Sequence, residues 1–183
     1  PDPEPEIKVP EYIDYRTGKW RHQGDAVDAW IGNNYQGILA MATGTGKTIT
    51  SMIALDHLLK EISPLLVVVS VPSNALLQQW TKEAEEFSIK TLIYKGSNRE
   101  EKLQNLGLLL KKEKRKLGLV IMTNDLLVKN KTHEILRSLE VKKLHIGDEV
   151  HNLGRTTFKE NPPDFFDFHL GLSATPKRQY DEE

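Results

Sequence analysis

One segment, residues 37–59 (GILAMATGTGKTITSMIALDHLL), holds the residue types best suited to chemistry. Gly44 and Gly46 stand in a loop between an apolar run and a long amphipathic stretch, and Lys47 and Thr48 follow them. Glycines let backbone amides turn inward without a clash at Cβ, so such a loop forms a nest for phosphate oxygens. The start of the following helix adds about half a positive unit charge at the same place.

Lys47 and Thr48 complete the phosphate-loop pattern G-x-x-x-x-G-K-[ST], except that Met41 replaces its first glycine. In such a loop the lysine reaches the terminal phosphates of a nucleotide, and the threonine hydroxyl ligates Mg²⁺. A glycine turn with an incidental lysine is the alternative interpretation. The predicted nucleotide ligands are Thr43, Gly44, Thr45, Gly46, Lys47 and Thr48.

A carboxylate pair, Asp148 and Glu149, closes a second apolar run in the segment LHIGDEVH. The carboxyl ends of parallel strands meet at one edge of a sheet, so the pair is expected to face the phosphate loop. We expect Asp148 to hold Mg²⁺, directly or through water, and Glu149 to orient and deprotonate an attacking water. Two surface acids that end a strand are the alternative, and His145 and Gly147 make this strand less apolar than most.

Short apolar runs alternate with amphipathic runs, which predicts an α/β fold: a parallel sheet with helices on both faces. The predicted helices cover residues 26–31, 46–60, 73–86, 98–116 and most of 124–139. The predicted strands cover residues 38–42, 65–71, 90–94, 117–123, 142–149 and 166–175. Ser73 is a good N-cap candidate for its helix.

Composition limits the class of protein. The 183 residues suffice for one domain with a sizeable core, and residues 13–183 are predicted to form it. Residues 1–12, rich in proline and acids, are predicted to be a tail or linker. The 25 basic and 26 acidic residues nearly cancel, so binding to nucleic acid requires a local surface. With no cysteine, no signal peptide and no long apolar run, the chain is predicted to be cytoplasmic and to need no membrane.

The order of these segments resembles the first RecA-like domain of a superfamily 2 helicase or translocase, over residues 19–178. ATGTGKT resembles motif I of that superfamily, DEVH (148–151) its motif II of the DExH type, and GLSATPKR (171–178) its motif III. WRHQ resembles the glutamine motif, VVVSVPSNALLQQW motif Ia and LVIMTNDLL motif Ib. The likeness is to bacterial DNA helicases, including restriction and repair enzymes.

The resemblance implies a role for each matching residue. Gln23 would read the adenine edge, and His151 would link the nucleotide to motif III and to a second domain. Of the remaining residues, one group would couple the nucleotide state to nucleic acid, and the other group would contact the nucleic-acid backbone. The coupling residues are Ser173, Ala174 and Thr175, and the backbone contacts are Pro72, Ser73, Asn74, Thr123 and Asn124.

The implied function is an ATP- and Mg²⁺-dependent motor that moves on nucleic acid, with DNA preferred to RNA. An RNA helicase, a P-loop switch without nucleic-acid activity and a non-catalytic binding module are the alternatives. The family has a second RecA-like domain that carries transition-state arginines, and none follows Arg178 here. We therefore expect a piece of a larger protein that hydrolyses ATP poorly by itself, since a missing arginine finger costs about 10³–10⁵ in rate.

Two other features have a structural and a functional interpretation. The basic run at 111–116, KKEKRK, is either the solvated end of a helix or a second nucleic-acid contact. Trp80 either packs with Leu76 and Leu77 at helical spacing or stacks on a base. In both cases the structural interpretation is favoured.

Overall fold

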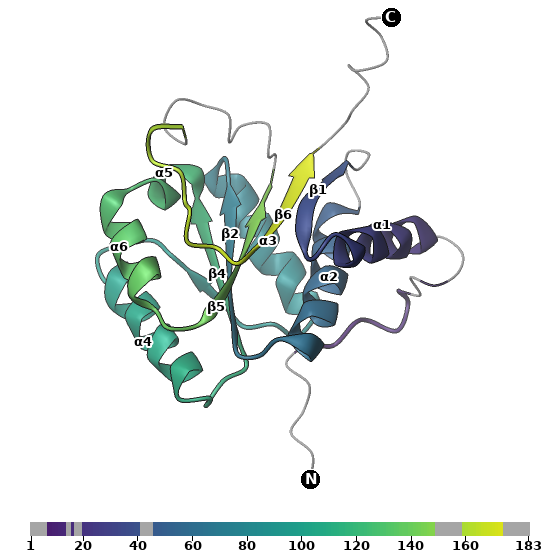
Figure 1. The fold of residues 1–183 in the computed structure, drawn as a ribbon, viewed down its shortest axis with the longest axis horizontal. Coiled ribbons are helices and arrows are strands. Elements are labelled where there is room, and N and C mark those ends of the chain that lie inside the picture. The colour runs from purple at the N-terminus through teal and green to yellow at the C-terminus, as the bar shows by residue number, and fades with distance from the viewer. Residues whose placement is uncertain (1–6, 14–15, 17–19, 41–45, 149–158, 174–183) are drawn as a thin grey trace, which may run out of the picture.

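A six-stranded sheet forms the centre of the computed structural model, which describes residues 7–13, 16, 20–40, 46–148 and 159–173. The strand order is β1-β6-β5-β2-β4-β3, and every neighbouring pair is parallel. Figure 1 shows that the carboxyl ends consequently share one edge of the sheet. The strands are β1 (Gln36–Ala40), β2 (Leu65–Val71), β3 (Thr91–Ile93), β4 (Leu117–Thr123), β5 (Lys142–Gly147) and β6 (Phe168–Ser173). The predicted fold class is confirmed.

Three helices cover one face of the sheet: α1 (Arg21–Gly32), α2 (Lys47–Glu61) and α3 (Asn74–Glu86). Their buried side chains join alternate residues of β2, such as Val67 and Val69, in one core. Met52 and Trp80 are among the largest side chains of this layer. Because successive side chains of a strand point to opposite faces, only half of each strand serves this core.

The other face carries α4 (Arg99–Lys111), α5 (Asn124–Leu127) and α6 (Asn130–Ser138). Leu66 and Val68 of β2 point into this second core, where Leu103 and Leu136 meet them. All seven residues of β2 are therefore buried, as expected for a central strand of a parallel sheet. The helices of this layer lie over the half of the sheet formed by β2, β4 and β3.

Two predicted helices differ from those observed. The helix predicted over 98–116 ends at Lys111, because Glu113 adopts a left-handed φ of 56°, which a helix cannot continue. Lys112 and Lys114 are exposed beyond its end, in agreement with the solvated interpretation of the basic run. The helix predicted over most of 124–139 is divided into α5 and α6, since Lys129 has an extended ψ of 139°.

The amino-terminal part also corrects the prediction. The first helix begins at Arg21 rather than at residue 26. The strand predicted over 38–42 is observed as β1 over Gln36–Ala40. Residues 41 and 42 of the predicted strand lie outside the residues that the structure describes. Ile38 is 63% exposed on β1, which is an edge strand of the sheet. Ile7 is buried against the first core, so packed structure begins within the segment predicted to be a tail.

Candidate active site

The amino terminus of α2 follows β1 in the sequence after residues 41–45, which the structure does not describe. Gly46 is its N-cap, and no side chain of the described residues caps it or places an acid in its first turn. Thr50 and Ser51 instead direct their hydroxyls to the carbonyls of Gly46 and Lys47. Among the described residues, no side-chain cap and no first-turn acid therefore compensates the positive end of the helix dipole at the first amides of α2, which suits an anion.

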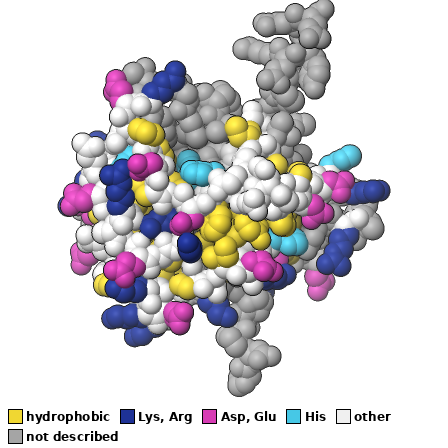
Figure 2. Space-filling model, in the orientation of Figure 1, with side chains coloured by type: hydrophobic (Ala, Val, Ile, Leu, Met, Phe, Trp, Pro, Cys, Tyr) yellow, Lys and Arg dark blue, Asp and Glu magenta, His cyan; other side chains and the backbone are white. Residues whose placement is uncertain are grey.

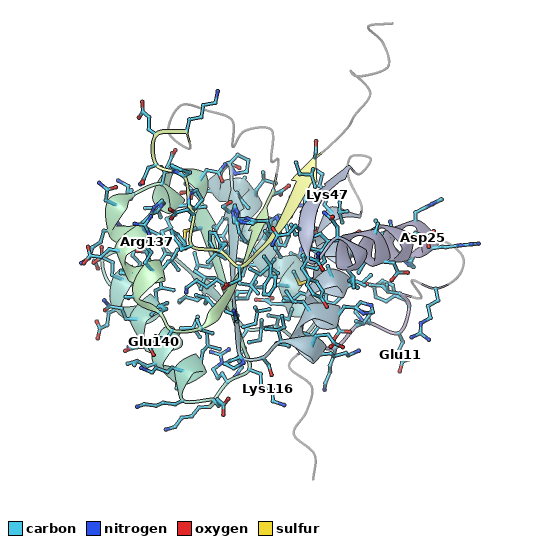
Figure 3. The ribbon with its side chains drawn as sticks, in the orientation of Figure 1. Glu11, Asp25, Lys47, Lys116, Arg137 and Glu140 are labelled. Atoms are coloured by element: carbon cyan, nitrogen blue, oxygen red, sulfur yellow. The ribbon has the colours of Figure 1, made fainter. Side chains whose placement is uncertain are left out.

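Lys47 extends from this helix start toward β5. Its Nζ lies 3.8 Å from Oδ1 of Asp148, and its side chain is only 15% exposed. Figure 3 shows Lys47 by the carboxyl ends of β1 and β6, away from Arg137 and Glu140 on the α4–α6 side. The sheet thus brings together two residues that are separated by a hundred positions in the sequence, as predicted from the parallel topology.

Asp148 directly follows β5 and is 5% exposed. Its backbone N–H donates to the carbonyl of Ser70 in β2, at 3.0 Å. Its Oδ2 accepts a hydrogen bond of 2.9 Å from the indole Nε1–H of Trp80. Its Oδ1 is buried and accepts no hydrogen bond from the residues that the structure describes. One carboxylate oxygen therefore accepts a hydrogen bond from Trp80, and the other lies beside the Lys47 ammonium.

This arrangement fits a magnesium ion shared with substrate. The described residues contain no cluster of three or more His, Asp or Glu side chains that could enclose a metal alone. Mg²⁺ at phosphoryl-transfer sites is usually held by one or two carboxylates, with substrate phosphates and water completing the shell. Oδ1 of Asp148, which accepts no hydrogen bond from the described residues, would supply one such ligand, and the nearby Lys47 would neutralise phosphate charge.

A buried polar pair supports the strand ends from the other face of the sheet. The Ser70 hydroxyl and Nε2 of His145 are hydrogen-bonded at 2.7 Å. The His145 ring also stacks on Phe166, with centroids 4.8 Å apart. Burial, aided by the neighbouring His169, lowers the pKa of His145 to about 3. His145 is therefore neutral at physiological pH and acts as a packing group, not as an acid or a base of the site.

The other predicted nucleotide-site residues fall in three places. Ser173 ends β6, which lies between β1 and β5, so it stands at the same edge as Lys47 and Asp148. Gln23 lies in α1, which packs on α2, and its Oε1 is buried without a hydrogen bond from the described residues. The other predicted residues lie outside the part of the chain that the structure describes: Thr43, Gly44, Thr45, Glu149, His151, Ala174 and Thr175.

The predicted nucleic-acid residues lie on adjacent strand ends. Val71 and Thr123 are register partners at the ends of β2 and β4, so Pro72 and Asn124 follow neighbouring strands. Pro72, Ser73 and Asn74 are exposed, and Thr123 and Asn124 are partly exposed. Ser73 caps α3, as predicted, by accepting from the amide of Leu76 at 3.3 Å. In Figure 2 both signs of charge are interspersed over the visible face.

Trp80 is 1% exposed, so it cannot stack on a base, and the packing interpretation is confirmed. Sequence reasoning missed its hydrogen bond to Asp148. Asp148 lies 68 positions from Trp80, and neither periodicity nor motif spacing predicts where α3 packs relative to the end of β5. The one available signal was that a buried tryptophan needs an acceptor for its N–H.

Comparison with known proteins extends this description. The sequence matches the family described as type III restriction enzyme, res subunit, over residues 19–178. It is 39% identical over 79 residues to the nuclear protein STH1/NPS1 of Saccharomyces cerevisiae, a match that covers 40% of this chain and 6% of the yeast protein.

Solved structures share the fold. One is the ATP-dependent type ISP restriction-modification enzyme LlaBIII bound to DNA, with a TM-score of 0.69 and 20% identity over 92% of this chain. Another is the SWI2/SNF2 ATPase core of Sulfolobus solfataricus in complex with dsDNA, with a TM-score of 0.63 and 19% identity over 97% of this chain. This chain spans only 13% and 34% of those two chains. At such identities the likeness establishes the fold alone.

Proposed function

Since this chain belongs to the type III restriction enzyme res subunit family and is the first RecA-like domain of a superfamily 2 helicase-type ATPase, we propose that it is the ATP-binding half of a DNA motor. In the whole protein, a second RecA-like domain would complete the active site and supply arginines for the transition state. Hydrolysis of ATP would then drive movement along DNA. The predicted cytoplasmic location remains a prediction; none of the described helices is long and apolar enough to span a membrane.

The first amides of α2 and the ammonium of Lys47 bind the phosphates of ATP in this proposal. Thr48 and Asp148 would hold Mg²⁺, and the chemistry that the ion would supply is neutralisation of phosphate charge. Lys47 Nζ and Asp148 Oδ1 lie 3.8 Å apart, so the fold itself positions the two charges that would receive the triphosphate and its metal. Such preorganisation favours catalysis, because little reorganisation is required during the reaction.

The remaining roles rest on the family resemblance. Glu149 orients and deprotonates the attacking water, and Gln23 pairs with adenine through its amide. The buried Oε1 of Gln23 supports this role, because it is an acceptor that receives no hydrogen bond from the described residues. His151 and the segment Ser173–Ala174–Thr175 transmit the nucleotide state to the nucleic-acid surface.

DNA is the proposed track, bound at the ends of β2 and β4. Short polar side chains and helix-start amides contact phosphate and sugar without reading sequence. The restriction enzyme and the ATPase core described above were both solved with DNA, which favours DNA over RNA. The segments 72–74 and 123–124 adjoin Asp148 through β2, since the Asp148 amide bonds to Ser70. The proposed DNA contacts are therefore close to the proposed metal ligand.

The observation that carries the proposal is the 3.8 Å approach of Lys47 Nζ to Oδ1 of the buried Asp148, an oxygen that accepts no hydrogen bond from the described residues. It is tested by ATP hydrolysis in the full-length protein, with and without DNA or RNA. We expect Lys47→Ala and Asp148→Asn each to lower DNA-stimulated turnover by at least about 100-fold, as expected for lost transition-state charge stabilisation.

Lys60→Ala is the matched control, because Lys60 lies on the same helix but is exposed and pairs with Asp56. We expect it to leave turnover within about twofold, as for an ordinary surface substitution. Undiminished turnover in the Lys47 variant would refute the phosphate site. ATP turnover that neither DNA nor RNA stimulates would favour a P-loop switch, and stimulation by RNA alone would favour an RNA helicase.

A further inference from the structure

Trp80 satisfies its buried indole N–H with the carboxylate of the candidate site. Its indole N–H donates to Asp148 Oδ2 at 2.9 Å, a normal length for a bond of this kind, although the residue is a member of the large apolar core. Trp80 is 1% exposed and Asp148 is 5% exposed, so little water competes for the bond. An indole N–H is a donor only, and the acceptor is an acid, which makes the bond charge-assisted when Asp148 is ionised.

The bond determines which oxygen of Asp148 is available. Oδ2 is occupied by the indole, while Oδ1 lies 3.8 Å from Lys47 Nζ and accepts no hydrogen bond from the described residues. Rotation of the carboxylate about its last torsion would exchange the two oxygens. With Trp80 in place, such rotation breaks a buried hydrogen bond, so the carboxylate is held in one orientation.

Trp80 itself is firmly placed. Leu77 and Ala84 lie on the same buried face of α3, at 1% and 0% exposure. The helix packs against α2, β2, β3 and β4, so the indole position is set by the core and not by the site. A rigid donor of this kind is what orients metal-binding side chains in proteins generally.

We propose that Trp80 is a positioning residue of the magnesium site: its indole holds Oδ2 of Asp148 so that Oδ1 stays directed at Lys47 and open to the metal. The proposal rests on the function proposed above and adds a residue outside the motif II acids. Without the indole, the carboxylate samples orientations that do not bind Mg²⁺ productively. Trp80 touches neither substrate nor metal in this scheme.

The test compares Trp80→Phe with Trp30→Phe in the full-length protein. Trp30 is also a buried tryptophan, 2% exposed, and its indole N–H donates to the His169 carbonyl at 2.8 Å in a part-buried bond, so each variant loses one indole hydrogen bond. ATP hydrolysis is measured against Mg²⁺ concentration at saturating DNA. We expect Trp80→Phe to raise the half-saturating Mg²⁺ concentration about tenfold or more, the usual effect of losing an orienting partner of a metal ligand. High Mg²⁺ should restore most of the turnover, which it would not do for a folding defect.

Trp30→Phe should leave the half-saturating Mg²⁺ concentration unchanged. If the parent is active and the two variants have the same Mg²⁺ dependence, the role of Trp80 is overturned and the proposed function is not. A parent without Mg²⁺-dependent hydrolysis would overturn both this role and the proposed function. If Trp80→Phe does not fold, the indole ¹H–¹⁵N resonances of the parent decide: addition of Mg²⁺ with an ATP analogue should shift the Trp80 signal and leave that of Trp30 in place. An unmoved Trp80 signal would refute the proposal.

Discussion

Acid should destabilise this fold through His145. Burial holds the pKa of this histidine at about 3, whereas an unfolded histidine has a pKa of about 6.5. As the pH falls below 6.5, His145 becomes protonated in the unfolded chain but stays neutral in the folded chain. The stability associated with neutral His145 is therefore complete above that pH and is lost progressively toward pH 3.

The magnitude follows from the two pKa values. Between pH 7 and pH 5 the folded state stays unprotonated while the unfolded state becomes almost fully protonated, which costs about 2 kcal/mol of unfolding free energy. The side chain is fully buried, so screening by solvent reduces this figure little. Urea unfolding at both pH values measures it, and the parent is compared with His145→Gln. Glutamine does not titrate in this range, and its amide can still hydrogen-bond to Ser70.

The difference between the two proteins isolates His145, because the other lowered histidines, His133 and His169, remain in both. We expect the stability advantage of the parent over His145→Gln to shrink by about 2 kcal/mol from pH 7 to pH 5. The same pH dependence in both proteins would refute the reasoning. It would show that His145 is protonated in the folded state.

Further predictions concern the core, the α3 cap and the catalytic acid. Leu103→Ala should lower the free energy of unfolding by about 2–5 kcal/mol, whereas Leu108→Ala on the same helix should change it by under about 0.5 kcal/mol, because Leu103 is 0% and Leu108 is 51% exposed; equal losses in urea unfolding would contradict the packing described. Ser73→Ala should cost about 1 kcal/mol by removing the cap on the Leu76 amide, while Ser73→Asp should keep the cap and yet weaken DNA binding through repulsion of phosphate. DNA titrations that do not distinguish Ser73→Asp from the parent would exclude a contact there. Glu149→Gln in the full-length protein should trap bound ATP, and single-turnover hydrolysis within a few-fold of the parent would show that Glu149 is not the base.

The buried strands were the part of the fold most accessible from sequence. The runs at 65–71 and 117–123 have the bounds of β2 and β4, because a central parallel strand is apolar on both faces and breaks abruptly at polar residues. The cap at Ser73 was predicted for a similarly local reason. Its hydroxyl bonds to an amide three residues away, so no tertiary information is needed.

The features that the sequence did not predict correctly are those with a weak local signal and those that depend on tertiary packing. The charged stretch after Lys111 has good helix formers, yet the chain turns at Glu113 to enter β4. The predicted approach of Lys47 to Asp148 followed from topology alone. The bond between Trp80 and Asp148 needed the actual placement of α3 on the sheet, which the sequence does not encode in any spacing.

The most direct test of the account is a structure of the full-length protein with Mg²⁺ and a non-hydrolysable ATP analogue. The account predicts the triphosphate at the amino terminus of α2, with Lys47 at the terminal phosphates and the metal on the Oδ1 side of Asp148, bound directly or through water. A triphosphate bound elsewhere, or a metal that leaves Asp148 Oδ1 without a partner, would contradict it.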